Sequence, residues 1–386
     1  MARKIRISAV TTTRADYGIM RPLLLKLDKE KWCDLRICVS GTHLLKDFGY
    51  TVDEIEKDNL NIVYKLKLNP DEDNQILKTA VIMSETVEGF TEYFLDEKPD
   101  VVLLLGDRYE VFEIAASATI CNIPIIHIAG GETTQGAMDE VFRHSLTKMS
   151  YLHLSSTQEY RNRIIQLGED PKRVYNTGAL GVENVKKVKC LSKKELERQL
   201  DFRLDRPYAV VTFHPVTLEN NSALKQLKEL LKVLNNHKEM KFIITKANAD
   251  IDGEKINNEL EKFVKKNDHC ILVASLGTLK YFSAIKYSEC VIGNSSSGIV
   301  EVPSFNKPTV NIGDRQKGRI QANSIINCKP LENDIEKALR KALKFDRKVI
   351  NPYGNGNTSD KMVRIIKKTF VDNKIDLKKV FYDLVK

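Results

Sequence analysis

Acidic residues and histidines gather in two stretches of the sequence that follow apolar, β-branched runs. The stretch "GDRYE" holds Asp107, and "HIAGGETTQGAMDEVFRHSLTK" holds Glu132, Asp139 and His144. Carboxylates act as general acid and general base when their surroundings separate their pKa values. Asp139 and Glu140 stand where a helix is expected to begin, a place that favours acidic residues in any protein. These stretches predict acid–base chemistry, and an ordinary helix start is the alternative for the second.

A run of serines flanked by glycines, "GNSSSG" at 293–298, follows the apolar run "ECVI" and precedes "IVEVPSF", which is expected to begin a helix. Backbone N–H groups at a helix start bind phosphate, and serine hydroxyls add donors. One serine would satisfy a helix cap, so Ser295 and Ser296 together favour a phosphate site over plain capping. Glu301, inside the expected helix, can accept the two hydroxyls of a ribose or simply face solvent.

Three arginines also follow expected strands: Arg14 in "TTTRADYG", and Arg315 and Arg319 in "NIGDRQKGR". The guanidinium fork matches phosphate oxygens bidentately, and each charge-assisted contact contributes roughly 1.5–3 kcal/mol. Serines and arginines together predict a site for a nucleotide diphosphate. The sequence has no GxxxxGK[ST] and no GxGxxG after a strand, which disfavours a P-loop NTPase and a dinucleotide dehydrogenase.

The elements that must position these residues alternate along the chain. Apolar runs of strand length are separated by segments with apolar residues at helical spacing, which predicts parallel sheets covered on both faces. The expected strands lie at 5–10, 35–41, 100–107, 124–131 and 151–156, and the pattern restarts after residue 206 with "AVVTFHP", "KFIITKA", "CILVAS", "ECVIGNS" and "PTVNIG". We expect an α/β fold of two Rossmann-like doubly wound domains that face each other across a cleft.

Polar residues directly after strands are the informative ones, because open α/β sheets bind ligands beyond the carboxyl ends of their strands. His214 in "TFHPVT" follows the first strand of the second domain, where a satisfied core histidine is the alternative. Asn248 opens another strand-end loop, "NADIDGEKINNE", which nearly fits a calcium loop but follows a strand where an EF-hand requires a helix. No metal is expected.

Length and composition exclude several classes of protein. At 386 residues the chain fits two domains. Its seven cysteines form no CxxC pair, which is typical of a reducing cytoplasm. The first residues fit neither a signal peptide nor a membrane span. The net charge of +9 comes mostly from lysines on amphipathic helices, so neither nucleic acid nor membrane is an expected partner.

At these residues the sequence resembles the UDP-N-acetylglucosamine 2-epimerase family, and in particular its hydrolysing branch, which makes N-acetylmannosamine for sialic acid biosynthesis. The motifs that carry the resemblance are "TTTRADYG", "LLLGDRYE", "HIAGGETTQGAMDEVFRHSLTKMSYLH", "NTGALG", "FHPVT", "GNSSSGIVEVP", "NIGDRQKGR" and "NPYGNGNTSDKMV". The resemblance implies the GT-B architecture, with domains at 1–180 and 181–364 and a C-terminal helical segment at 365–386 that returns to the first domain. It also implies a homodimer or homotetramer that needs no cofactor.

The resemblance further implies roles for single residues. Those implied to hold the uridine diphosphate are Arg14, Ser295, Ser296, Glu301 and Arg315, and those implied to surround the sugar are Asp107, Glu132, Asp139 and His214. We expect further substrate contacts from Arg108, Arg143, His144, Asn248 and Arg319. The pair Arg143–His144 resembles the hydrolysing branch, whereas Ala129 stands where many of these epimerases carry a glutamate.

The resemblance leaves three alternatives open. One is a hydrolysing 2-epimerase of a UDP- or GDP-linked 2,4-diacetamido-trideoxy sugar, on the way to legionaminic acid. The second is a non-hydrolysing epimerase, which would return UDP-N-acetylmannosamine. The third is a GT-B glycosyltransferase, which would need an acceptor.

Overall fold

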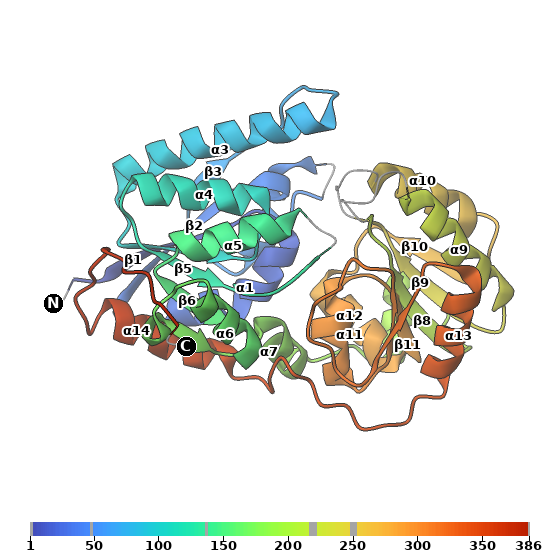
Figure 1. Cartoon of the computed structure of the whole chain (residues 1–386). Coiled ribbons are helices and arrows are strands. Elements are labelled where there is room, and N and C mark those ends of the chain that lie inside the picture. Colours follow the sequence, from blue (N-terminus) through green and yellow to red (C-terminus); the bar gives the residue numbers. More distant parts are fainter. Residues whose placement is uncertain (1–2, 47–48, 136–137, 216–221, 248–252, 385–386) are drawn as a thin grey trace. The chain divides into compact units, whose positions relative to one another are not determined.

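The computed structural model describes residues 3–46, 49–135, 138–215, 222–247 and 253–384. The chain divides into two compact units, seen in Figure 1. Unit 1 comprises Met1–Glu132, Asp139–Asn184 and Gly356–Lys386, and unit 2 comprises Thr133–Met138 and Val185–Asn355. Unit 1 is therefore built from three separate stretches of the chain, the last of which is its C-terminal end.

The described residues of unit 1 form a seven-stranded parallel sheet in the order β3-β2-β1-β4-β5-β6-β7. Neighbouring side chains of a strand point to opposite faces: Ile7 and Ala9 pack into one core, and Val10 packs into the other. Both faces are buried, which explains the continuous apolar runs. The strands are β1 (Ile5–Thr11), β2 (Cys33–Ser40), β3 (Ile62–Leu66), β4 (Val101–Leu105), β5 (Ile125–Ile128), β6 (Leu152–Ser155) and β7 (Val174–Asn176).

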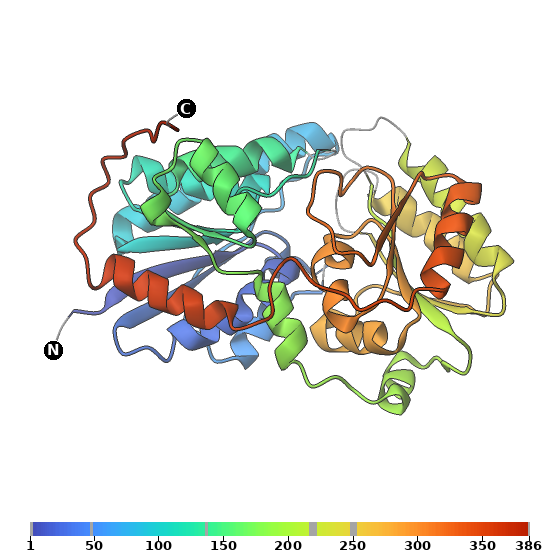
Figure 2. The same cartoon turned by 60° about the horizontal axis from the view of Figure 1, so that its bottom comes forward.

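Helices cover both faces of this sheet. One core includes residues of α1, α2 and α14, and the opposite core includes residues of α3, α4 and α5. The helices of unit 1 are α1 (Arg14–Leu27), α2 (Val52–Lys57), α3 (Gln75–Glu97), α4 (Tyr109–Ile120), α5 (Asp139–Met149), α6 (Gln158–Gln166), α7 (Leu180–Lys187, which runs into unit 2) and α14 (Thr358–Phe370), with the 3-10 helices η1 (Gly41–Leu44) and η3 (Pro171–Arg173). Figure 2 shows α14 beside α1, and the two helices are in contact.

Unit 2 repeats this plan with a six-stranded parallel sheet among its described residues, in the order β10-β9-β8-β11-β12-β13. Residues of α9, α10 and α13 pack on one face, and residues of α8, α11 and η4 pack on the other. The elements are α8 (Lys193–Leu200), β8 (Tyr208–Thr212), α9 (Ala223–Asn236), β9 (Lys241–Thr245), α10 (Gly253–Val264), β10 (Cys270–Val273), α11 (Gly277–Tyr287), β11 (Cys290–Gly293), α12 (Ser296–Val300), η4 (Val302–Phe305), β12 (Thr309–Ile312), β13 (Ile325–Cys328) and α13 (Glu332–Leu343).

Both sheets have a topological switch point, where successive strands are added on opposite sides of a central pair. In unit 1 this point lies between β1 and β4, and in unit 2 it lies between β8 and β11. Ligands of doubly wound folds bind in the crevice beyond the carboxyl ends of the strands at such a point. The loops after these four strands are therefore where the fold can build a site.

Two expected helices differ from the structure. The helix at the end of the chain is α14, Thr358–Phe370, and the described residues after 370 form no further helix, so the helical segment expected at 365–386 is mostly irregular. The helix expected after the serines is α12, only five residues long, and the 3-10 helix η4 follows it. Pro303 breaks the α-helical pattern there, because it lacks the N–H that the next turn requires. Among the described residues, no helix is long and apolar enough to cross a membrane.

Candidate functional site

In unit 1, charged groups are concentrated around Arg143 of α5, whose side chain is 1% exposed. Its guanidinium donates to the carboxylates of Asp107 and Glu140, and to the main-chain carbonyl of Glu132 at 3.0 Å. A buried cation needs such partners, because an unpaired one would lose its hydration without compensation. Arg143 thus brings together residues that follow β4 and β5.

The turn after β4 holds Asp107 in place. Gly106 has a φ of +84°, in the left-handed region that favours glycine, and its N–H donates to the carbonyl of Ile128 at 3.1 Å. Nε2 of His127 donates to the carbonyl of Gly106 at 2.8 Å, which assigns the ring proton to Nε2 because a carbonyl can only accept. Burial lowers the pKa of His127 to about 4, so the ring is neutral at pH 7.

The other acid–base candidates of unit 1 lie in the loop after β5 and in α5. Glu132, 7% exposed, accepts a hydrogen bond from the hydroxyl of Ser156 at 2.9 Å. Asp139 is the first residue of α5 and is half-buried. His144, one residue after Arg143, lies 3.3 Å from a carboxylate oxygen of Glu140 through Nε2. One helix therefore carries Asp139, Arg143 and His144, and the strand-end loops supply the other carboxylates.

The two loops at the switch point of unit 1 are linked through charges. Arg14 is the first residue of α1, and Thr13 and Asp16 close a capping box around this helix start. Burial raises the pKa of Asp16, and the positive charge of Arg108, in the loop after β4, acts in the opposite direction. The Nε atom of Arg108 also donates to Glu110 at 3.2 Å. Arg14 and Arg108 thus lie at the carboxyl ends of the two strands that flank the switch point.

In unit 2, the serine loop follows β11 directly. Ser295 occupies the N-cap position of α12, and within the described part of the chain its side chain makes no capping hydrogen bond. Ser296 is exposed and Ser295 is half-buried. Glu301 is the C-cap of α12 and is 8% exposed, so it lies against protein rather than on an open helix face. The alternative that Ser295 serves only as a helix cap is not realised in this geometry.

A hydrogen-bonded cluster connects the serine loop to the loops after β8 and β12. The side chain of Asn294 binds both main-chain groups of His214, and the main-chain carbonyl of Asn294 accepts from Arg315 at 3.2 Å and from Gln316 at 2.9 Å. The strands β8, β11 and β12 are neighbours in the sheet, so their carboxyl ends lie side by side. Arg319 follows in the same loop as Arg315 and is half-buried.

The structure joins several of the predicted residues within each unit. Asp107, Glu132 and Arg143 are joined in unit 1, and His214 and Arg315 are joined through Asn294 in unit 2. Asn248 lies outside the described residues. Sequence reasoning missed Asn294, Gln316 and Asp16, although all three stand inside quoted motifs; their polar side chains between selected residues were the available signal.

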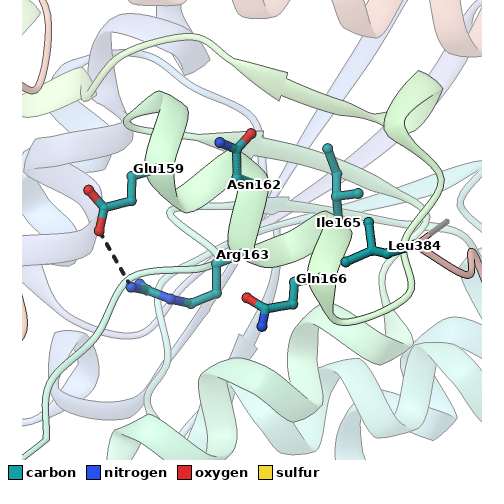
Figure 3. Close-up of a pocket in the computed structure, with 6 residues that line it drawn as sticks. All are labelled: Glu159, Asn162, Arg163, Ile165, Gln166 and Leu384. Carbon is teal, nitrogen blue, oxygen red and sulfur yellow. Dashed lines mark ion pairs between the residues drawn. The ribbon is translucent and has the colours of Figure 1, made fainter. Parts of the chain in front are cut away.

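No group of three or more His, Cys, Asp or Glu side chains able to hold a metal occurs within the described ranges. A surface pocket of about 480 Å³, shown in Figure 3, is lined instead by the α6 residues Glu159, Asn162, Arg163, Ile165 and Gln166 and by Leu384 from the C-terminal end. In Figure 3 the Arg163 side chain points toward Glu159, with 3.8 Å between the charged atoms. None of the predicted site residues lines this pocket.

Known proteins resemble the chain over nearly its whole length. The sequence profile of the UDP-N-acetylglucosamine 2-epimerase family matches residues 25–367. A Campylobacter jejuni protein named GDP/UDP-N,N'-diacetylbacillosamine 2-epimerase (hydrolyzing) is 42% identical over 339 residues, which is 88% of this chain and 87% of that protein. The polysialic acid biosynthesis protein P7 of Escherichia coli is 41% identical over 389 residues, covering 98% and 97%.

A solved structure shows the same fold. The crystal structure of UDP-GlcNAc 2-epimerase from Neisseria meningitidis bound to UDP-GlcNAc superposes with a TM-score of 0.80 at 18% identity, covering 94% of this chain and 100% of the other. The expected α/β fold of two Rossmann-like domains, of the GT-B type, is confirmed. The profile match and the two relatives above 40% identity show that the chain belongs to the UDP-N-acetylglucosamine 2-epimerase family, in its hydrolysing branch.

Proposed function

We propose that the protein is a hydrolysing nucleotide-sugar 2-epimerase that converts UDP-N-acetylglucosamine and water into N-acetylmannosamine and UDP, a reaction that supplies sialic acid biosynthesis. The observation that carries this proposal is the identity of 41% over 98% of the chain with a polysialic acid biosynthesis protein, within a family of 2-epimerases. The network in which the buried Arg143 joins the half-buried Asp107 and Glu140 supports it, because it places charged acid–base groups near the strand ends of unit 1.

The chemistry must begin with the leaving group. The C2 proton of the sugar has no adjacent carbonyl to acidify it, so a base alone is inadequate. Departure of UDP builds positive charge at C1, which loosens the C2 hydrogen. A carboxylate then removes that proton and leaves 2-acetamidoglucal. Water adds across the double bond, its hydroxyl to C1 and a proton to the opposite face of C2, so N-acetylmannosamine results. Elimination and addition leave the oxidation state unchanged and call for no redox cofactor.

The proposed binding residues differ in the part of the substrate that each contacts. Arg14, Ser295, Ser296, Arg315 and Arg319 supply donors to the diphosphate, where negative charge develops as the bond to C1 breaks. Glu301 is assigned to the ribose hydroxyls, and Arg108, His144 and Asn248 to further substrate contacts.

Proton transfer falls to the carboxylates and His214. Asp107 accepts a hydrogen bond from Arg143 and is one candidate for the carboxylate that removes the proton from C2. Glu132, Asp139 and His214 are the candidates for the donor that delivers the second proton to C2. We also propose that the protein acts in the cytoplasm, where a nucleotide-sugar substrate is available. The family resemblance favours a homodimer or homotetramer.

A second substrate is favoured by a specific observation. The Campylobacter jejuni relative, at 42% identity, is named for a GDP- or UDP-linked diacetylbacillosamine. The two sugars differ at C4, where an acetamido group replaces a hydroxyl, and at C6, where the trideoxy sugar lacks a hydroxyl. The proposed chemistry at C1 and C2 is the same for both.

Nucleotide release from the two kinds of sugar tests the proposal. We expect UDP and N-acetylmannosamine to accumulate in equal amounts from UDP-N-acetylglucosamine, measured by chromatography, with slower release from UDP- and GDP-linked 2,4-diacetamido-trideoxy sugars. Faster turnover of a diacetamido sugar would transfer the assignment to that substrate. Accumulation of UDP-N-acetylmannosamine without free UDP would contradict the hydrolysing reaction.

A further inference from the structure

We propose that Asn294 is a positioning residue that fixes His214 against the diphosphate-binding loop of unit 2, at the switch point of the sheet. The inference rests on the proposed function, in which His214 takes part in proton transfer and Arg315 binds the diphosphate. Asn294 does not touch the reacting atoms in this proposal. It acts through the residues that it holds.

The side-chain amide of Asn294 forms hydrogen bonds with both main-chain groups of His214. Its Oδ1 accepts from the N–H of His214 at 2.7 Å, and its Nδ2 donates to the carbonyl of His214 at 2.8 Å. The orientation of the amide follows from chemistry, because a main-chain N–H can only donate and a carbonyl can only accept. Asn294 is 0% exposed, so water does not compete for these bonds. The backbone of His214 is thereby fixed at the point where the chain leaves β8.

The backbone of Gly293 and Asn294 lies directly against the end of β8. The N–H of Asn294 donates to the carbonyl of Thr212 at 3.1 Å. Gly293 has a φ of +137°, and a Cβ atom there would lie 1.8 Å from the carbonyl oxygen of Thr212. Only glycine permits this approach. The loops after β8 and β11 would otherwise diverge at the switch point, because the helices that follow them cover opposite faces of the sheet.

The same residue also reaches the loop after β12. Its main-chain carbonyl accepts from Nη1 of Arg315 at 3.2 Å and from Nε2 of Gln316 at 2.9 Å. Gln316 is 1% exposed. Asn294 therefore joins three strand-end loops in two separable ways: its side chain holds His214, and its main chain holds Arg315.

This separation allows a sharp substitution. Asn294→Asp keeps the shape of the side chain and the acceptor for the N–H of His214. It replaces the donor with a carboxylate oxygen that faces the carbonyl of His214 and repels it, while the main-chain carbonyl to Arg315 is unchanged. Misplacing a catalytic group by about 1 Å lowers turnover by about 100-fold. We therefore expect Asn294→Asp to lower kcat by about 10- to 100-fold and to raise the Kd for UDP by a smaller factor, because the new carboxylate repels the diphosphate while the main-chain contact to Arg315 remains.

Removing a contact to the main chain of Asn294 should give the complementary result. Gln316→Leu removes the second donor to the main-chain carbonyl of Asn294. It leaves intact the two hydrogen bonds between the Asn294 side chain and the backbone of His214. It should weaken UDP binding, measured by titration calorimetry, by a larger factor than it lowers kcat. If Asn294 and Gln316 had only structural roles, both substitutions would lower the melting temperature, and neither would change kcat and the Kd for UDP by different factors.

Asn257 provides the matched control. It makes the same two-bond clamp on another residue of unit 2, accepting from the N–H of Ala247 at 2.8 Å and donating to its carbonyl at 3.3 Å. Asn257→Asp therefore makes the same chemical change at a residue that is less buried than Asn294. We expect its kcat to fall by a smaller factor than that of Asn294→Asp, because Ala247 is not a catalytic residue and only precedes the substrate-contact candidate Asn248.

The experiment measures kcat, KM and the Kd for UDP of the full-length wild type and the three variants with UDP-N-acetylglucosamine, after circular dichroism has shown that each is folded. If Asn294→Asp does not fold, Asn294→Ser, which keeps a neutral polar group, carries the same prediction. Wild-type kcat in Asn294→Asp or Asn294→Ser, or equal losses in Asn294→Asp and Asn257→Asp, overturns the positioning role. A wild-type enzyme that releases no nucleotide from any of the sugars refutes the proposed function instead.

Discussion

Arg143 illustrates what single residues contribute to this site. Its side chain is 1% exposed, yet it is tolerated because two carboxylates and one main-chain carbonyl surround it. The sequence pattern could select Arg143 and Asp107 as polar residues near strand ends. It could not show that the two are paired, because 36 positions separate them and only the sheet order β4-β5 brings their loops together.

His127 leads to a prediction about pH. Burial lowers its pKa to about 4 from an ordinary 6.5, so between these pH values the unfolded chain binds a proton that the folded chain does not. Stability rises with pH in such a window, by up to about 1.4 kcal/mol per pH unit for one proton, and is lost as the pH falls toward 4. We expect His127→Asn to flatten the fall in unfolding free energy between pH 6.5 and 4, measured by urea denaturation.

His237 is the control for this measurement. Its burial acts to lower the pKa, but hydrogen bonds to Glu239 and Glu336 outweigh burial and raise it. A raised pKa affects stability above pH 6.5 and not below it. His237→Asn should keep the wild-type slope between pH 6.5 and 4, and an equal slope in all three proteins would contradict the role given to His127.

At the scale of elements, the segment after α14 fastens the end of α5. The ammonium group of Lys379 donates to the carbonyls of Lys148 and Ser150, at 2.8 and 2.7 Å, and pairs with Glu169 at 2.7 Å. Carbonyls at a helix C-terminus lack intrahelical partners and carry partial negative charge. Although burial alone would raise it, hydrogen bonds from His153, Lys148 and Lys379 lower the pKa of Glu169 to about 2.

Replacing Lys379 tests this contact. Lys379→Met should lower the free energy of unfolding by about 1–3 kcal/mol, because two carbonyls and a buried carboxylate lose a donor. Its neighbour Lys378 is exposed, and Lys378→Met should change the stability by less than about 0.5 kcal/mol. Thermal denaturation of both variants makes the comparison. Equal melting temperatures would show that the segment after α14 does not stabilise α5.

Elements were predictable where the local signal was strong. The buried central strands β1, β4, β5, β8 and β11 lie within or beside their predicted runs, because a strand covered on both faces must be apolar throughout. The edge strands β3, β7 and β13 were missed, since half-exposed residues such as those of β3 give no continuous apolar run. The irregular path after 370 was also missed, because tertiary contacts such as that of Lys379, and not local propensity, hold it.

For the whole molecule, the sequence could predict two doubly wound units but not which loops join within each. Repeated strand–helix alternation specifies the architecture, and the positions of His214, Arg315 and the serine loop follow from strand ends. Asn294 escaped this reasoning, because its role depends on three loops meeting at the edge of the sheet of unit 2. Function in this fold depends on such loops, since the same architecture supports unrelated reactions.

The central claim is that UDP departs before the C2 proton is replaced by one from water. Turnover of UDP-N-acetylglucosamine in deuterated water tests it most directly, with the sugar product examined by proton NMR and mass spectrometry. The account predicts N-acetylmannosamine that carries one deuterium at C2, with one UDP released for each sugar formed. A product that retains the original hydrogen at C2 would contradict it.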